Sequence, residues 1–255
     1  MNLVDTHAHI YLDEFEGSVE EVVQNAKEAG VDRIYLPNID SGTIEDMIRL
    51  EQLYSGFFYP MMGLHPTSVQ ENYMAELETI ERWLDKRSFS AVGEVGIDLY
   101  WDDTYQKEQE HAFEIQLKWA KEKNMPVVIH SRESFQEIFN VVDRLNDDRL
   151  YGIFHSFAGN IEEARHAIDL GFKLGINGIV TFKNSSLDEV VSHIDINHLV
   201  LETDSPFLAP VPRRGKRNES AYLKYIAQKI AEIKKLTLED VAAITTRNAL
   251  NVFRS

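Results

Sequence analysis

The chain has no cysteine among its 255 residues. A disulfide framework, a thiolate metal site and a cysteine nucleophile are therefore excluded. Proteins of reducing compartments rarely depend on disulfides, so the composition fits a cytosolic protein.

A signal peptide and a membrane span are also missing from the sequence. The first residues, MNLVDTHAHIYL, contain no basic segment followed by an apolar run. No apolar stretch is long enough to cross a bilayer. We expect a cytoplasmic location and no membrane partner, and no oligomeric state is predicted.

Positive charge is scarce. Lysine and arginine number 26 against 42 aspartates and glutamates, which gives a formal net charge of −16. This balance excludes broad electrostatic adhesion to DNA through a basic surface. Bound divalent cations would offset several negative charges at the place where a phosphate must lie. A phosphate-bearing substrate is therefore expected to bind locally and with modest affinity.

Short apolar runs rich in Val, Ile and aromatic residues alternate with segments of helical periodicity. The eight predicted strands span residues 2–7, 33–37, 57–64, 89–95, 126–130, 151–155, 172–176 and 198–202. The clearest helical patterns span residues 18–30, 104–123, 133–145, 161–170, 221–234 and 238–253. Thr237, followed by Glu239 and Asp240, resembles a helix N-cap with an acidic first turn.

Eight strand–helix repeats with continuous apolar strands predict a parallel sheet covered by helices. Eight is the number of strands that closes an α/β barrel, so we predict a (β/α)₈ TIM barrel. It would be a single domain over residues 1–255 with an extra C-terminal helix. The alternative is an open doubly wound sheet, which usually carries a glycine-rich phosphate loop. No G-x-G-x-x-G motif follows the first predicted strand.

Potential metal ligands lie at the ends of several predicted strands. In a barrel these positions meet at the C-terminal rim, where active sites of this fold are built. The candidates are His7 and His9 after the first strand, Glu94 in the fourth, His130 in the fifth, His155 in the sixth and Asp204 after the eighth.

Each candidate also has a simpler explanation. Alternate residues of a strand face the same side, so His7 and His9 can both point into the mouth. They can equally be two histidines at a polar strand end. Glu94 can form a salt bridge, and Asp204 can be a helix N-cap before Ser205-Pro206. The joint set of imidazoles and carboxylates favours a metal site.

The six candidates divide into two sets. His7, His9 and Asp204 can hold one divalent ion, His130 and His155 a second, and Glu94 can bridge them. This arrangement leaves open positions for water and substrate, as catalytic sites require. Two ions can activate a water for phosphoryl transfer, with Asp204 as the proton acceptor. Glu94 and Asp204 are therefore the predicted catalytic residues.

The ordered motifs resemble those of the TatD family of metal-dependent deoxyribonucleases over nearly the whole chain. The motifs are Asp5-Thr6-His7-Ala8-His9, Gly63-Leu64-His65-Pro66, Gly93-Glu94-Val95-Gly96-Ile97-Asp98, Ile129-His130-Ser131-Arg132, His155-Ser156-Phe157-Ala158-Gly159, Leu201-Glu202-Thr203-Asp204-Ser205-Pro206 and Arg214-Gly215-Lys216-Arg217-Asn218-Glu219. One departure is Ser220, where the family commonly has proline.

The resemblance implies a Mg-dependent nuclease with 3′ exonuclease character that acts on single-stranded DNA ends. Some relatives have been proposed as deacylases. The same six residues are implied as ligands of two divalent ions, which can be Zn, Mn or Mg. Because a His-rich site suits Zn or Mn better than Mg, we expect a transition metal in the isolated protein.

Substrate contacts are predicted around the same rim. By resemblance His65 contacts a phosphate, although it can also be a structural histidine beside Pro66. Arg132 can reach a non-bridging oxygen, or it can pair with Glu133. The basic loop with Arg213, Arg214, Lys216 and Arg217 can face phosphates or simply be solvated. Tyr100 and Trp101 can stack on a terminal base or pack as a lid.

Two other functions remain open at this stage. The same ions could polarise a carbonyl, which would make the protein a deacylase or amidohydrolase. A non-catalytic protein could also keep a metal for structure, but structural sites are usually closed by four protein ligands. The open coordination positions predicted for the two ions favour catalysis.

Overall fold

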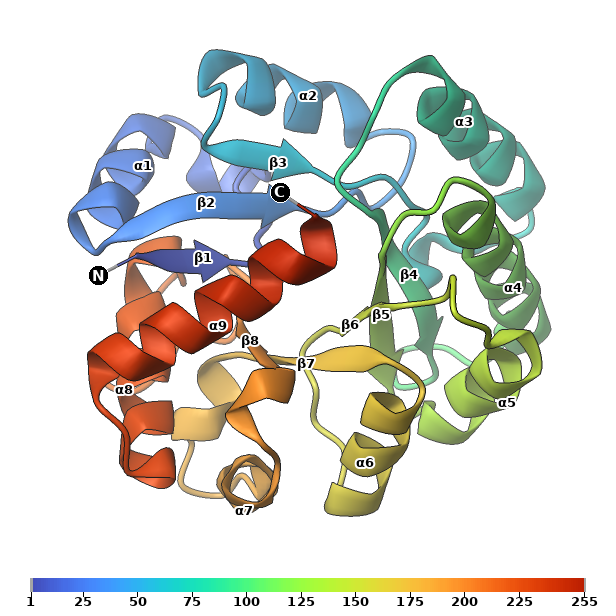
Figure 1. Cartoon of the computed structure of the whole chain (residues 1–255). Helices are drawn as coiled ribbons and strands as arrows, with labels where there is room; N and C mark the ends of the chain where they lie inside the picture. Colours follow the sequence, from blue (N-terminus) through green and yellow to red (C-terminus); the bar gives the residue numbers. More distant parts are fainter. Residues whose placement is uncertain (1, 255) are drawn as a thin grey trace.

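The computed structural model describes residues 2–254, in which eight strands alternate with helices around a ring (Figure 1). The strands are β1 Leu3–Asp5, β2 Val31–Leu36, β3 Phe58–Pro60, β4 Val92–Asp98, β5 Val127–Arg132, β6 Gly152–Phe154, β7 Phe172–Ile176 and β8 Leu199–Leu201. The helices are α1 Val19–Glu28, α2 Ile44–Leu53, α3 Tyr73–Lys86, α4 Gln106–Glu122, α5 Phe135–Leu145, α6 Ile161–Asp169, α7 Leu187–His193, α8 Leu223–Lys234 and α9 Leu238–Phe253.

All paired strands run parallel, in the orders β1-β2-β3 and β4-β5-β6-β7-β8. Two parallel bridges join these groups. Met62, just after β3, pairs with Val92 of β4, and Ala8, after β1, pairs with Ser205, after β8. The strands therefore form the predicted (β/α)₈ barrel, and the open doubly wound alternative is excluded.

Three helices were not singled out from the sequence: α2, α3 and α7. The first two have apolar faces like the others, with Met47 and Ile48 buried in α2 and Leu77 and Ile80 in α3. The third has only seven residues, which is about two turns and too short for a clear helical period. Each of these helices follows a strand, as the strand–helix repeat requires.

The extra C-terminal helix closes one end of the barrel. Inward-facing residues from the strands, such as Val4, Val128 and Val200, form one apolar cluster with Val252 and Phe253 of α9. The rings of Tyr35 and Phe253 stack with 3.6 Å between their centroids. This cluster lies toward the N-terminal ends of the strands, and α9 crosses that opening (Figure 1). The opposite end remains for a site.

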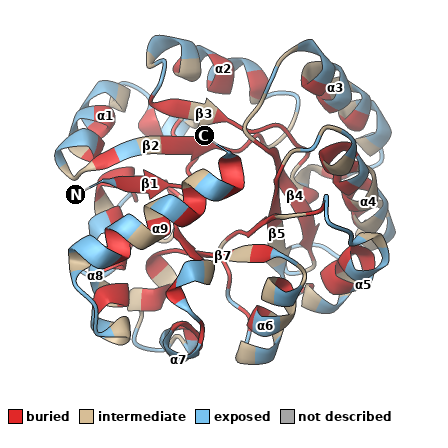
Figure 2. Cartoon of the chain, viewed as in Figure 1, coloured by how far each residue is buried: buried red, intermediate tan, exposed pale blue. Residues whose placement is uncertain are grey.

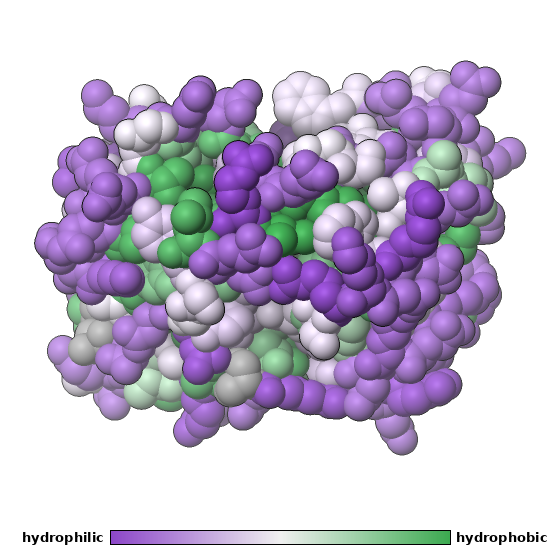
Figure 3. All heavy atoms as spheres, turned by 90° about the horizontal axis from the view of Figure 1, so that it is seen from above, coloured by the Kyte–Doolittle hydropathy of each residue, from purple (hydrophilic) through white to green (hydrophobic). Residues whose placement is uncertain are grey.

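Burial follows the expected layers. The strands are almost wholly buried, while the outer faces of the helices are exposed (Figure 2). On the side of the molecule drawn in Figure 3, hydrophilic residues cover most of the surface, with smaller apolar patches between them. Among the helices of residues 2–254, none has the length and apolar character needed to cross a membrane.

Candidate metal centre

The barrel brings the six predicted ligands to its C-terminal end. His7 and His9 follow β1, and Asp204 follows β8. The other three belong to or follow β4, β5 and β6: Glu94, His130 and His155. Apart from the neighbours His7 and His9, these residues are far apart in sequence. They meet because the parallel strands of a barrel all end at one rim.

Glu94 lies at the centre of this group and is 2 % exposed. Its Oε2 atom is 3.0 Å from Nε2 of His7 and 3.6 Å from Nε2 of His9. Its Oε1 atom is 2.7 Å from Nδ1 of His130 and 3.6 Å from Nε2 of His155. A single buried carboxylate thus faces all four predicted histidine ligands.

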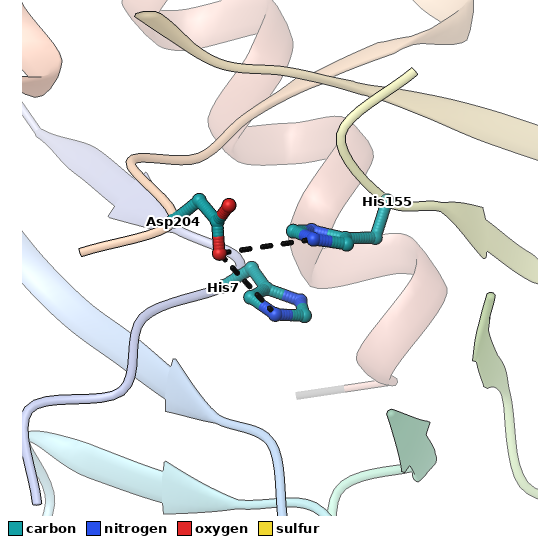
Figure 4. Close-up of side chains that lie close together, drawn as sticks. All are labelled: His7, His155 and Asp204. Carbon is teal, nitrogen blue, oxygen red and sulfur yellow. Dashed lines mark ion pairs between the residues drawn. The ribbon is translucent and has the colours of Figure 1, made fainter. Parts of the chain in front are cut away.

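Asp204 contributes a second carboxylate to the same group. Its Oδ1 atom lies 3.9 Å from Nε2 of His7 and 3.8 Å from Nε2 of both His9 and His155. Figure 4 shows its carboxylate facing the rings of His7 and His155. Asp204 has a φ of +58°, a left-handed backbone conformation that costs free energy and that aspartate tolerates better than most residues. The fold therefore fixes this carboxylate toward the histidines.

Three sets of side chains have donor atoms that all lie within 4.8 Å of one another. They are His7 with His9 and Glu94, His7 with His155 and Asp204, and His65 with Glu94 and His130. This grouping differs from the division expected from sequence in two respects. His155 lies with Asp204, and His65, expected to contact only substrate, has its Nε2 atom 3.2 Å from Glu94 Oε1.

Charge in this cluster is poorly balanced without a cation. Burial, followed by repulsion from Glu94, raises the pKa of Asp204 well above its ordinary value. Burial, followed by repulsion from His7, lowers the pKa of His9 well below its ordinary value. His130 is the exception: burial lowers its pKa, but hydrogen bonds to Asp98 and Glu94 outweigh burial and raise the pKa to about 9, so a metal ion would have to displace that proton. Imidazoles beside crowded carboxylates are the donor set that a divalent transition metal takes. The side chains present therefore fit a metal ion.

A second layer of carboxylates touches the histidines from behind. Glu202, fully buried, has its Oε1 atom 2.9 Å from Nδ1 of His155. Asp98, 2 % exposed, has its Oδ2 atom 2.8 Å from Nε2 of His130. Carboxylates in this position fix the orientation and tautomer of a histidine ligand. Neither carboxylate was predicted as a site residue, although each lies inside one of the ordered motifs, because a strand-end position indicates which side chains reach an ion and not which lie behind them.

The cluster forms the floor of a pocket of about 440 Å³. His65, Arg132 and Trp101, three of the predicted substrate contacts, line this pocket. Tyr100 does not line it but lies below Arg132, whose guanidinium carbon is 3.8 Å from the centroid of the tyrosine ring. The expected pairing of Arg132 with Glu133 is not among the ion pairs of residues 2–254.

The basic loop lies farther away than the sequence suggested. Arg214, Lys216 and Arg217 do not line this pocket. The Arg217 guanidinium donates to the backbone oxygen of Glu14 at 2.7 Å and to Ser18 Oγ at 2.8 Å, so it ties the loop to the segment before α1. Arg214 stacks on Phe182 at 3.8 Å and faces a separate cleft.

A (β/α)₈ barrel with a buried His, Glu and Asp cluster at its C-terminal rim defines a metal-dependent hydrolase. The family model described as TatD related DNase matches residues 4–254, so the chain belongs to the TatD family. It is 38 % identical over 253 residues to the uncharacterized metal-dependent hydrolase YabD of Bacillus subtilis, covering 99 % of each chain.

Solved structures agree with the sequence comparison. The crystal structure of YjjV, a TatD homologue from Escherichia coli K12, superposes with a TM-score of 0.93 at 28 % identity, covering 99 % of this chain and 98 % of that one. A TatD family hydrolase from Entamoeba histolytica superposes with a TM-score of 0.84 at 22 % identity, covering 99 % and 98 %, and supports the fold alone.

Proposed function

We propose that this chain hydrolyses phosphodiester bonds in DNA and removes nucleotides from the 3′ ends of single strands with two divalent ions. The observation that supports this most is the position of Glu94. Its carboxylate lies within 3.6 Å of five imidazoles, those of His7, His9, His65, His130 and His155. Residues 1–255 would act as one domain, because the site draws side chains from both ends of the chain.

In this proposal His7, His9, Glu94, His130, His155 and Asp204 would together hold the two ions, and His155, which lies near both Glu94 and Asp204, could serve either ion. Such ions, when bound, neutralise charge on the phosphoryl group and make water acidic near neutral pH. Asp204 is the proton acceptor. Its Oδ1 atom faces the cluster, 3.8 Å from Nε2 of His9 and of His155, so it would lie beside a water held by the ions.

The pocket walls suit a nucleotide. Arg132 can present its planar guanidinium to a non-bridging oxygen, and stacking on Tyr100 holds that group in place. His65 lies beside the cluster and can donate to the same phosphate. Trp101 is 69 % exposed and Phe207 48 % exposed at the mouth, so their rings are available for a base.

The test compares two substrates on one metal-loaded preparation. A single-stranded oligonucleotide with a 3′ label should be shortened from that end, and an aminoacyl ester should not be cleaved. The Glu94→Ala variant should abolish the activity. Turnover of the ester alone would overturn the nuclease proposal in favour of a deacylase.

We also expect metal analysis of the isolated protein to find Zn or Mn, and Mg alone would contradict that expectation.

A further inference from the structure

A second cleft, of about 530 Å³, lies beside the pocket of the metal centre. It is lined by Phe182, Lys183, Ser185, Ser186, Val211 and Arg214. These residues come from the segment after β7 and from the basic loop after β8. The cleft thus offers two cations and two hydroxyls in a chain whose net charge is −16.

The cations of this cleft are not used inside the protein. Seven of the 26 lysines and arginines form ion pairs with carboxylates in residues 2–254, such as Arg87 with Glu51 and Lys118 with Glu114. Within the same residues, neither Lys183 nor Arg214 has a carboxylate partner. The Arg214 guanidinium instead stacks on the ring of Phe182, which fixes it without neutralising it.

One chain segment separates this cleft from the metal centre. Phe207 and Leu208 line the pocket of the centre, and Val211 lines the cleft. An extended chain from Phe207 to Val211 covers at most about 14 Å, so the two hollows are close neighbours. The Val211 amide donates to Thr181 Oγ1 at 2.9 Å, and this bond fixes the shared wall.

We propose that this cleft binds a second phosphate of a single-stranded polynucleotide, at a distance from the scissile bond. The inference rests on the nuclease activity proposed above and explains how an acidic protein holds a polyanion. Arg214 and Lys183 supply charge to the phosphate, and the hydroxyls of Ser185 and Ser186 supply hydrogen bonds. A substrate of two nucleotides has a single internucleotide phosphate, the scissile one, and so offers none to this cleft.

The test uses the double variant Lys183→Gln/Arg214→Gln and a matched control, Arg49→Gln/Lys118→Gln. The control removes the same charge from α2 and α4, and both of its residues have exposed side chains. Equilibrium binding is measured by fluorescence anisotropy with oligothymidylates of two to twelve nucleotides. A phosphorothioate linkage at the 3′ end resists hydrolysis. Cleavage of a dinucleotide and an octanucleotide is measured in parallel.

For the cleft variant we expect about tenfold weaker binding of the octanucleotide and less than a twofold change for the dinucleotide. The slope of log affinity against log salt should decrease by about 0.7, because one phosphate contact of a single strand is lost. The proposal is overturned if the cleft variant shows the same dependence of binding affinity on oligonucleotide length as the wild type and the control.

The two proposals fail in different ways. If wild type cleaves DNA but the cleft variant equals the control, the cleft is not a phosphate site and the nuclease proposal stands. If wild type binds oligonucleotides through the cleft but cleaves none, the nuclease proposal fails and the cleft proposal stands. If wild type binds no oligonucleotide, both are wrong.

Discussion

The Glu202 carboxylate lies 2.9 Å from Nδ1 of His155, on the side of the ring away from Glu94, to which Nε2 is directed. Glu202 also accepts from the backbone amide of Ser156, the residue after His155. One buried side chain thus bonds to the backbone next to a predicted ligand and lies against the ring of that ligand. The arrangement matches the carboxylate–histidine pairs that orient ligands at metal centres.

Replacing Glu202 with glutamine should weaken metal binding by about tenfold to a hundredfold. Glutamine keeps the shape of the side chain but loses the charge that fixes the His155 tautomer. Titration of the metal-free protein with Zn²⁺ against a competing chelator measures this loss. Glu81→Gln, an exposed position in α3, is the matched control and should bind as wild type does. An unchanged Glu202→Gln affinity would show that Glu202 does not position the ligand.

Gly175→Ala should weaken metal binding as Glu202→Gln does, although it replaces no charged residue. A Cβ atom at Gly175 would lie 2.2 Å from Oε2 of Glu202, so the carboxylate would have to move. The Glu202 side chain is fully buried and cannot move into solvent. The same Zn²⁺ titration checks this, and ¹⁵N chemical shifts of His155 should report a changed ring environment. A double variant no weaker than either single variant would show that both act through one contact.

The metal-free protein should lose stability as pH rises from 6.5 to about 9. Burial opposes the charge on His130, but hydrogen bonds to Asp98 and Glu94 outweigh it and raise the pKa of His130 from 6.5 to about 9. A raised pKa stabilises the fold fully below pH 6.5, and this contribution is lost as pH passes through 9. It is on the order of 3 kcal/mol at most.

Two buried carboxylates act in the same direction, because burial raises the pKa of Glu202 to about 7 and raises that of Asp204 well above its ordinary value. The part of the loss that depends on Asp98 therefore identifies the contribution of His130. Burial lowers the pKa of His155 to about 3, so above pH 6.5 it is neutral in both folded and unfolded chains. Urea unfolding in a chelator at several pH values from 6 to 9.5 measures the effect. Asp98→Asn removes one partner of His130 and should flatten the dependence. A wild-type stability that is constant over this range would contradict the assignment of the raised pKa to His130.

The barrel and the cluster could be predicted from sequence because both follow from local patterns. Apolar strands spaced by helical segments predict the repeat, and the positions of His7, His130 and His155 at strand ends place them on one rim. The position of a residue at a strand end does not determine the rotamer of its side chain. It therefore could not show that His65 turns toward Glu94 or that Asp98 lies behind His130.

The basic loop shows the opposite case. Its residues are adjacent in sequence, and sequence alone suggested one phosphate-facing patch. In the structure Arg217 bonds to the segment before α1, whereas Arg214 faces the second cleft beside Lys183. Neighbouring side chains in an irregular loop have no fixed period, so their directions depend on tertiary contacts that the sequence does not display.

Phe253 of α9 and Tyr35 of β2 form an aromatic plug at the end of the barrel opposite the metal site. Removing this plug should lower the free energy of unfolding and leave metal binding intact. Phe253→Ala deletes a ring that is 7 % exposed and stacks on Tyr35, which should cost about 3 kcal/mol in the free energy of unfolding. Leu53→Ala, at a side chain that is 69 % exposed, should cost less than about 0.5 kcal/mol. Urea unfolding measures both. Because α9 closes the end of the barrel opposite the cluster, Phe253→Ala should bind Zn²⁺ with wild-type stoichiometry below its unfolding range. Loss of metal binding while the variant is still folded would mean that the plug and the metal centre are coupled through the barrel interior.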